Sequence, residues 1–501
     1  MRHLGRILLA GSALISTLAA SSQSFVTYTT TESDAWQKGK ASLKNKPIGD
    51  LLIEVDGTEQ GTEFHAWGTT FNELDWDAFN LLTSAEQDEI MYRLFAPDGD
   101  LRFTHGRVSM NANDYARSWY SCSEVSGDFE LRHFNIERDK QNIIPLARAA
   151  QHYCPELQLF MSPWSPPAWM KINQDYPVLS SKYNTQDPRQ DYVLYMDDGK
   201  AVDPDEMKLL GARGGVFPHR LALQDYFIQD PRYLQCYADM FCRFIDLYAE
   251  QGLPITKVMY QNEAYSYTPY PGCAWTAEGT LRFNVEYLAP TLAKHHPEVE
   301  LWLGTFNTNR LDYIQRILDD ATLQQLIKGV GTQWECRYVL PELRERYPNL
   351  RFMQSESECG NGRMDWSAGE HTFMLISDNL GNGCDEYYNW NFILPDNGSS
   401  SWGWTQNALI QVDSHTRTYR YTAEYYAYKH FSHFVAKGTR MVGYSGRQHA
   451  STPVVVFEDE NGYIITAGNF TDEAKEVHVK LAGKYLNMKL PPHSFNTFVE
   501  R

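Results

Sequence analysis

The sequence lacks the features of several large classes of protein. No run of lysine or arginine stands out, and the formal net charge is −18. A nucleic acid partner is therefore not expected, because binding phosphate groups needs a basic face. None of the eight cysteines forms a C-x-x-C pair, which argues against a structural zinc site. These absences favour a neutral ligand and no metal.

Long apolar runs are also missing from the body of the chain. After the N-terminus no segment reaches about 18 consecutive apolar residues, the length of a membrane span. At the N-terminus, Arg2 and Arg6 precede an apolar stretch over 7–18, and Ala19-Ala20 follow as a small-residue cleavage site. We predict a cleavable export signal over residues 1–20. The mature protein should be soluble, without stable membrane insertion, in the periplasm or outside the cell.

Aromatic residues are abundant, with 13 Trp and 31 Tyr among 501 residues. They could build a large core or a surface that stacks on flat or sugar-like ligands, and composition alone favours the core. The cysteines leave a similar choice. An exported chain could oxidise some of them, but buried free thiols are the favoured expectation.

Between about Phe64 and Leu394, short apolar strands alternate with amphipathic helices. The helix expected within 230–252 shows the pattern, because its large apolar residues recur at helical spacing and Gly252 and Pro254 then end it. Eight candidate strands are found, at 63–73, 101–111, 157–164, 255–263, 299–307, 329–335, 350–356 and 385–394. They predict an α/β fold, a (β/α)8 TIM barrel with insertions. The rival is a doubly wound sheet, but no Gly-rich phosphate loop follows the first strand.

The pattern changes towards both ends of the chain. After about Tyr419, short alternating strands with turn signals predict a small β-sandwich over 419–501, and we expect N-terminal strands within 21–60 to join it. The catalytic barrel would then span 61–418. An insertion at about 172–224 leaves the third barrel strand and should lie on the catalytic face.

Carboxylates stand at the ends of three predicted barrel strands, where the chemistry of such barrels lies. They are Asp114, Glu263, and the pair Glu356 and Glu358. Alone, each would more often be a surface acid. Glu263 and Glu356 lie three βα units apart, at strands 4 and 7, which could bring their carboxyl groups within about 5 to 5.5 Å, as a retaining glycosidase needs. Asn262 could bind the 2-hydroxyl of the sugar. Spacing leaves Glu356 and Glu358 equally possible.

Three segments resemble glycoside hydrolase family 30, whose clan A retaining enzymes include lysosomal glucosylceramidase and microbial β-1,6-glucanases. They are "SPWSPPAWMK" from Ser162, "QNEAYSYTPYPGC" from Gln261 and "LRFMQSESECG" from Leu350. The resemblance runs from about residue 60 to the C-terminus and omits the insertion. It implies a barrel with a side β-sandwich built from both ends of the chain.

The resemblance also implies roles for individual residues. Glu263 becomes the acid/base and Glu356 the nucleophile, and no metal or cofactor is needed. The residues expected to bind the sugar are Arg107, Asp114, Trp164, Asn262 and Trp390, and the rigid "SPWSPP" segment would hold Trp164 against it. One departure follows the sixth strand, where Gln333-Trp334-Glu335 replaces the His-Trp-Tyr pattern of glucosylceramidases. Trp334 is grouped with the substrate-binding residues.

We therefore expect an exported retaining β-glycosidase, most readily an endo-acting β-1,6-glucanase whose partner is a β-glucan or another β-glucoside. A glucosylceramidase-like or exo-acting β-glucosidase is the alternative. A non-catalytic glycan-binding protein is a third reading, which retention of both Glu263 and Glu356 disfavours. We further expect a raised pKa for Glu263, since a general acid must hold its proton near the working pH.

Overall fold

The computed structural model describes residues 24–184, 186, 196–197, 200–201, 225–445 and 450–501. The predicted export signal over 1–20 and most of the predicted insertion lie outside these residues. Within them, no helix is both long and apolar enough to cross a membrane.

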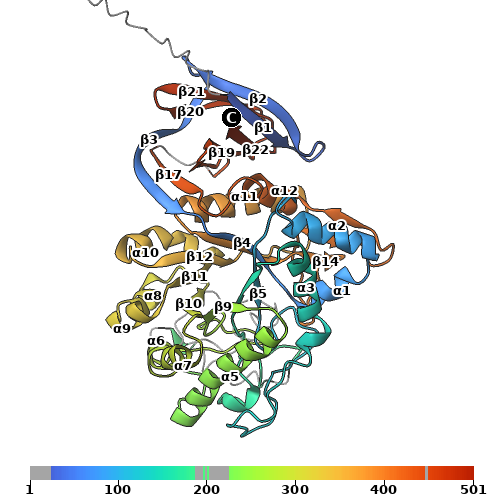
Figure 1. The fold of residues 1–501 in the computed structure, drawn as a ribbon, viewed down its shortest axis with the longest axis vertical. Helices are drawn as coiled ribbons and strands as arrows, with labels where there is room; N and C mark the ends of the chain where they lie inside the picture. The colour runs from blue at the N-terminus through green and yellow to red at the C-terminus, as the bar shows by residue number, and fades with distance from the viewer. Residues whose placement is uncertain (1–23, 185, 187–195, 198–199, 202–224, 446–449) are drawn as a thin grey trace, which may run out of the picture.

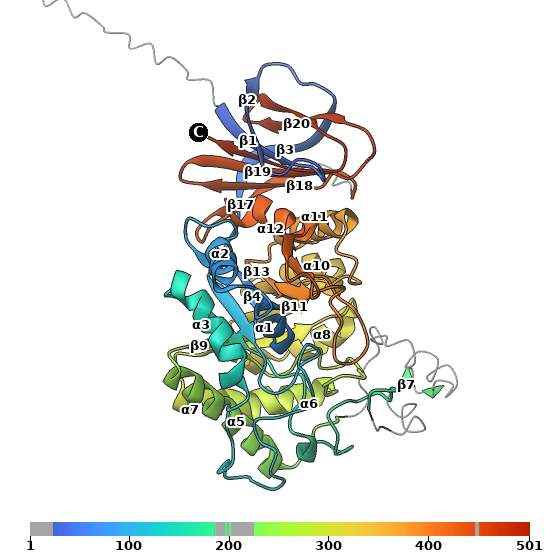
Figure 2. The same ribbon diagram turned by 90° about the vertical axis from the view of Figure 1, so that its right-hand side faces the viewer.

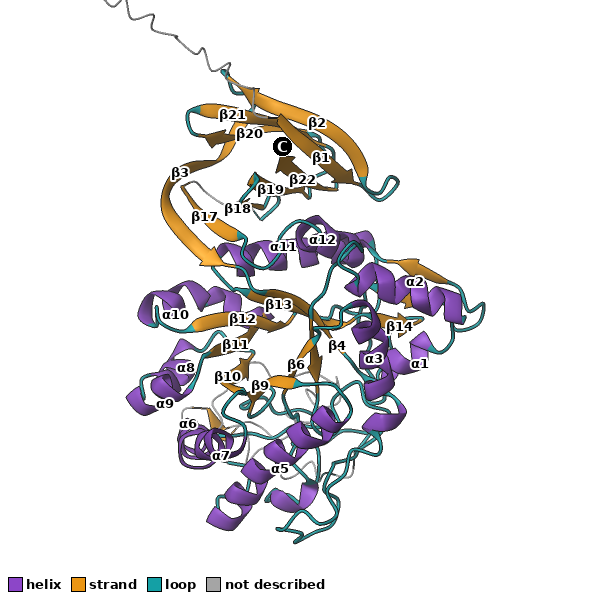
Figure 3. Ribbon diagram, viewed as in Figure 1, coloured by secondary structure: helices purple, strands orange, loops and turns teal. Residues whose placement is uncertain are grey.

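The centre of the molecule is a closed barrel of parallel strands (Figure 3). Each of the eight predicted strands contains one of its members, so the predicted (β/α)8 fold is confirmed. In chain order the strands are β4 (Ala66–Thr70), β5 (His105–Val108), β6 (Gln158–Met161), β9 (Ile255–Met259), β10 (Glu300–Phe306), β11 (Gly329–Gln333), β12 (Arg351–Glu356) and β13 (Glu386–Asn391).

Helices follow the strands and cover the barrel (Figure 1). The helix α5 (Pro231–Glu250) shows why they form: Asp230 caps its first turn, and Leu234, Tyr237 and Phe241 are buried. Phe244 and Tyr248 on the same face of the helix are buried too, and Leu247 is half-buried. The other helical elements of this layer are α1 (Glu73–Phe79), α2 (Ser84–Phe95), η1 (Asp139–Gln141), α3 (Ile143–Tyr153), η2 (Ala168–Met170), α6 (Ala277–Arg282), η4 (Phe283–Leu288), α7 (Ala289–His295), α8 (Leu311–Leu318), α9 (Ala321–Leu326), η5 (Trp334–Tyr338), α10 (Leu340–Arg346) and α11 (Trp366–Gly381).

A second, mostly antiparallel sheet joins the two ends of the chain, as predicted. The first strand, β1, pairs with the last, β22, and the nine described strands close on themselves rather than forming two separate sheets. Alternate side chains such as Ile53 and Val479 fill its own core. Its strands are β1 (Ser24–Thr30), β2 (Gln37–Lys44), β3 (Asp50–Glu63), β17 (Arg440–Ser445), β18 (Val454–Asp459), β19 (Gly462–Asn469), β20 (Lys475–Leu481), β21 (Lys484–Leu490) and β22 (Ser494–Glu500).

The helix α12 (Ala423–Ser432) lies between the barrel and this side sheet, beside α11 (Figure 2). Its buried His430 bonds Thr30 and Thr497, one from each end of the chain, at 2.8 Å. The C-terminal part of the side sheet was predicted to begin at residue 419. In the structure its first C-terminal strand begins at Arg440, and α12 lies before it. Short strands complete the described chain: β7 (Met196–Asp197), β8 (Lys200–Ala201), β14 (Ile393–Pro395), β15 (Ile410–Val412) and β16 (Tyr419–Tyr421).

A buried ion cluster joins β9 to β12 and β13, on the opposite side of the barrel, near the amino ends of the strands. Lys257 Nζ donates to both carboxylate oxygens of Glu386 at 2.8 Å, and Arg351 donates to Glu386 at 2.7 Å. Although burial acts to raise it, the pKa of Glu386 is lowered to about 2, with Lys257 the largest opposing cause. A depressed carboxyl pKa stabilises the fold above the unfolded pKa, so this contribution is lost as pH falls towards 2.

Replacing Lys257 with methionine is expected to destabilise the fold by about 3–5 kcal/mol, because Glu386 keeps a buried charge with one fewer cation. Urea unfolding at pH 7 measures the change. The control is Lys489→Met, which breaks the exposed pair with Glu476 and should leave the stability close to that of the parent. Equal losses in the two variants would contradict the importance of the cluster.

Candidate active site

The "SPWSPP" segment forms a rigid rim directly after β6, as the sequence indicated. Its carbonyl groups accept hydrogen bonds from the ends of neighbouring strands: Pro163 from the Asn262 backbone at 2.7 Å, and Ser165 from Asn111 Nδ2 at 2.9 Å. The Trp164 carbonyl accepts from the Gln261 side chain. These bonds fix the backbone on both sides of Trp164.

The buried Lys171 ties the rim to the loop after β9. Its Nζ donates to the carbonyl groups of Tyr176 at 2.6 Å and Gly272 at 2.7 Å, and to Ser165 Oγ at 3.3 Å. Burial lowers the pKa of Lys171 to about 8. Its role in the described structure is therefore to hold loops together.

Arg107, Trp164 and Trp390 pack together although they come from β5, the rim and β13. The tryptophan rings lie 5.1 Å apart at 30°, and the Arg107 guanidinium lies 4.4 Å from the Trp164 ring centre and 5.4 Å from that of Trp390. All three side chains are almost fully buried. The structure thus brings together three of the residues expected to bind a sugar.

Arg107 is also the centre of a polar network that reaches one predicted catalytic carboxylate. It donates to Oε2 of Glu356 at 2.5 Å, to Oδ1 of Asn262 at 2.8 Å and to Oγ of Ser162 at 3.0 Å. A buried cation in contact with a carboxylate favours its ionised form. Glu356 is therefore positioned to carry a negative charge.

Gln333, the residue at which the chain departs from the glucosylceramidase pattern, joins the same network from the end of β11. Its Nε2 donates to Glu356 Oε2 at 3.1 Å and to Asn262 Oδ1 at 2.9 Å. Thr305 Oγ1 also donates to that Asn262 oxygen, at 2.6 Å. Gln333, Thr305 and Ser162 were not predicted as site residues, although the ends of the strands that carry them were.

Glu263 follows β9 and has different surroundings. Its backbone has a positive φ of 46°, and its N–H donates to the carbonyl of Thr305 at 2.9 Å. Asn307 Nδ2 donates to Oε1 at 2.9 Å, while the buried Oε2 has no hydrogen-bond partner among the described residues. Asn307 was missed as a site residue; its signal was an amide at the end of a predicted strand.

Burial raises the pKa of both Glu263 and Glu356. At Glu356 the neighbouring Arg107 opposes the rise most strongly, whereas Glu263 has no cation in hydrogen-bonding contact within the described structure. Arg107 therefore favours the charged form of Glu356, although burial still leaves the pKa of Glu356 raised to about 7. Asp114, also buried, has a pKa raised by burial and by the charge of Glu356.

Two further buried polar atoms near this network lack partners in the described part of the chain. They are Oδ1 of Asp114 and Nε1 of Trp390, an acceptor and a donor. Leaving such atoms unpaired is costly, so a ligand that can both donate and accept hydrogen bonds would be favoured here. Sugar hydroxyl groups have this chemistry.

Glu358, the alternative to Glu356, and Trp334, a predicted substrate-binding residue, are not part of the network. Glu358 pairs with His371 on α11 and is partly exposed. The structure therefore distinguishes Glu358 from Glu356, a distinction that their spacing in the sequence could not make. Trp334 opens the short helix η5 and is half-buried. Within the described residues it makes no hydrogen bond or ring contact with the other predicted site residues.

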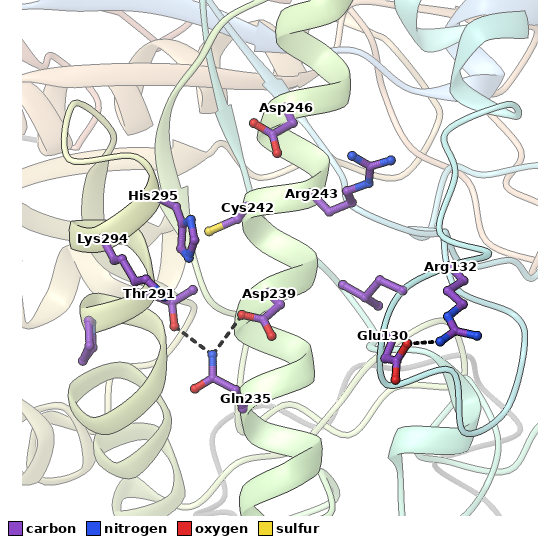
Figure 4. Close-up of a pocket in the computed structure, with 12 residues that line it drawn as sticks. Glu130, Arg132, Gln235, Asp239, Cys242, Arg243, Asp246, Thr291, Lys294 and His295 are labelled. Atoms are coloured by element: carbon purple, nitrogen blue, oxygen red, sulfur yellow. Dashed lines mark hydrogen bonds and ion pairs between the residues drawn. The ribbon is translucent and has the colours of Figure 1, made fainter.

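A separate groove of about 940 Å³ lies between α5, α7 and the loop near residue 131, in the outer helical layer (Figure 4). Acidic and basic side chains alternate along it, including Asp239, Arg243 and Lys294. It contains none of the predicted site residues. Across the described chain, no group of His, Cys, Asp or Glu is arranged to hold a metal ion, and all eight cysteines are unpaired.

Comparison with known proteins identifies the family of the chain. A model of the glycosyl hydrolase family 30 TIM-barrel domain matches residues 64–196 and 227–435. A putative glucosylceramidase 1 of Caenorhabditis elegans is 24% identical over 80% of this chain and 72% of its own. The endo-1,6-beta-D-glucanase neg1 of Aspergillus fumigatus is 23% identical over 57% of this chain and 52% of its own. The solved structure of SrfJ from Salmonella typhimurium has a TM-score of 0.79 at 20% identity, covering 95% of this chain and 99% of that one. The chain therefore belongs to glycoside hydrolase family 30 and is a glycosidase.

Proposed function

We propose that the protein is a retaining β-glycosidase in which Glu356 is the nucleophile and Glu263 the acid/base. The observation that carries this assignment is the contrast between two buried carboxyl groups. Glu356 accepts hydrogen bonds from Arg107 and Gln333, which favour a carboxylate. Glu263 accepts a hydrogen bond from the neutral amide of Asn307 and has no cation in hydrogen-bonding contact among the described residues, which favours a proton donor.

The reaction proceeds in two displacements. A carboxylate oxygen of Glu356 forms a bond to the anomeric carbon while the glycosidic C–O bond breaks, and the Glu263 proton passes to the departing oxygen. Glu263, now ionised, takes a proton from water. The water oxygen then attacks the anomeric carbon, releasing Glu356 and the sugar with its original configuration.

The substrate class we favour is β-1,6-linked glucan, cleaved within the chain. The Aspergillus endo-1,6-beta-D-glucanase supports this choice, and the replacement of the His-Trp-Tyr pattern by Gln333-Trp334-Glu335 weighs against a ceramide glycoside. The second candidate is glucosylceramide or a small β-glucoside, which the similarity to the Caenorhabditis glucosylceramidase supports. The apolar N-terminal stretch supports export, which N-terminal sequencing of the mature protein would test.

The product profile on β-1,6-glucan over time distinguishes the two substrate candidates. Mixed oligosaccharides at early times are expected for endo action, with slower turnover of an aryl β-glucoside and of glucosylceramide run in parallel. Release of glucose alone, or cleavage of the small glycosides only, would support the second candidate.

Replacing Gln333 with methionine is expected to move the acid limb of the kcat/KM profile to higher pH. The amide donor favours the ionised form of Glu356, so its loss raises the pKa of that carboxyl group. At a given acidic pH a larger fraction of the enzyme then carries a protonated, inactive Glu356. We expect activity near the acid limb to fall about 10-fold, for a shift of about one pKa unit. Gln333→Glu tests the same contact with a like charge and should shift the limb in the same direction. An unchanged acid limb in both variants would contradict the role of Gln333.

A further inference from the structure

A row of aromatic rings leads away from the two catalytic glutamates. Tyr270 lies 4.8 Å from Trp404, which stacks on Trp402 at 6.4 Å. Trp402 lies 4.9 Å from Trp119, and Trp119 stacks on Tyr176 at 6.2 Å and 18°. These five residues follow β5, β6, β9 and β13 and so belong to the catalytic face of the barrel.

The inner end of the row lies at the catalytic site. Besides burial, the charges of Glu263, Asp114 and Glu356 raise the pKa of Tyr270, so its hydroxyl group lies within their electrostatic range. Tyr270 and Trp402 also belong to the same apolar cluster as Trp164 and Trp390, and Trp119 and Trp404 pack against that cluster. The row is therefore continuous with the pocket proposed for the first sugar.

Three of the five rings keep part of their surface exposed. Tyr270 and Trp402 are buried, whereas Trp119, Trp404 and Tyr176 are half-buried. Tryptophans that served only as core would be expected to be covered as completely as Trp302, which is 0% exposed. Rings that stay partly exposed along the row are what a surface continuing a pocket would show.

The loop that carries two of these tryptophans is held by the hydroxyl groups of two serines. Ser400 Oγ accepts hydrogen bonds from the N–H groups of Trp402 at 3.2 Å and Trp404 at 3.4 Å, and Ser401 donates to the carbonyl of Ala116 at 2.8 Å. Gly403 between them has a φ of 93°, and a Cβ there would lie 2.2 Å from the Tyr183 ring. The rings are thus presented by a fixed rather than an adaptable loop, which lowers the cost of binding.

We propose that Trp404, Trp119 and Tyr176 form a binding surface for further glucosyl units of a polymeric substrate, beyond the unit held at the catalytic glutamates. The C–H faces of a glucosyl unit are apolar and pack on aromatic rings, while its hydroxyl groups stay in water. A neutral polymer suits this row better than a charged one, because its members are uncharged and the whole chain is acidic. The inference rests on the proposed function and adds a preference for longer chains.

The experiment compares Trp119→Ala and Trp404→Ala with the parent enzyme on β-1,6-linked gluco-oligosaccharides of increasing length and on an aryl β-glucoside. We expect kcat/KM on the longest oligosaccharides to fall about 10-fold, equivalent to about 1.4 kcal/mol, mainly through KM. On the aryl β-glucoside the change should stay below about 2-fold, since that substrate ends before the row. Trp119→Phe, which keeps a ring, should recover most of the loss.

The matched control is Trp366→Ala, a half-buried tryptophan of α11 that stacks on Phe495 of the side sheet. It should leave the dependence on chain length unchanged. Equal losses on the oligosaccharides and the aryl β-glucoside would overturn the inference, because they would indicate a structural role. So would a parent enzyme that hydrolyses β-glucosides with no gain from chain length. A parent inactive on every β-glucoside would instead contradict the proposed function and this inference together.

Discussion

Replacing Glu356 with glycine is expected to lower kcat by about 10⁴-fold or more, because it removes the carboxylate proposed to form the bond to the anomeric carbon. Arg107 would lose its buried carboxylate partner, so thermal unfolding must be measured alongside activity. Hydrolysis of an aryl β-glucoside with a good leaving group gives the rate. Binding of the substrate should persist, since Trp164 and Trp390 are unchanged.

Addition of sodium azide separates loss of the nucleophile from loss of the fold. The small anion can enter the space left by the side chain and attack from the same face, giving an α-glycosyl azide and recovered turnover. The control is Glu358→Gly, two residues further on, whose carboxyl group pairs with His371 outside the network. Strong inactivation of Glu358→Gly, with Glu356→Gly still active, would reverse the assignment.

Replacing Glu263 with glutamine is expected to lower kcat/KM on glucan or alkyl β-glucosides by about 10²–10⁴-fold. The loss should be much smaller for an aryl glucoside whose leaving group departs without a proton. In the parent, burial raises the pKa of Glu263, so the acid keeps its proton to higher pH and activity falls when that proton is lost. The variant should lack this basic limb.

The control for Glu263→Gln is Glu278→Gln, which removes an exposed carboxylate paired with Arg316. That variant should keep the rate and the pH profile of the parent. A basic limb unchanged in Glu263→Gln, or an equal loss for good and poor leaving groups, would contradict the assignment of Glu263 as the acid/base.

The barrel could be predicted from the sequence because each strand is a short apolar run followed by polar residues and a helical pattern. β9 and β12 illustrate this, since their predicted ends carry Glu263 and Glu356. The rim could also be predicted, because Pro163, Pro166 and Pro167 leave the backbone few alternatives. The joining of the two chain ends could be predicted because the N-terminal strands precede the barrel and need other strands to pair with.

The network around the glutamates could not be predicted, because it depends on side-chain directions at strand ends far apart in sequence. Gln333 was noted only as a departure from a pattern, and its hydrogen bond to Glu356 appears only in three dimensions. Spacing alone left Glu356 and Glu358 equally possible and only the family resemblance favoured Glu356, whereas the chain path after β12 turns Glu358 towards His371. Closure of the side sheet depends on the parallel pairing of β20 with β3. The alternation of apolar and polar residues shows which face of each strand is buried, but it does not show which strands pair or in which register.

The most direct test of the central claim is the configuration of the first product released from a β-glucoside, followed by proton NMR before mutarotation. A catalytic pair acting by double displacement predicts that the β-anomer forms first and the α-anomer appears later by mutarotation. Formation of the α-anomer first would show inversion, and it would contradict Glu356 as a nucleophile and Glu263 as its acid/base.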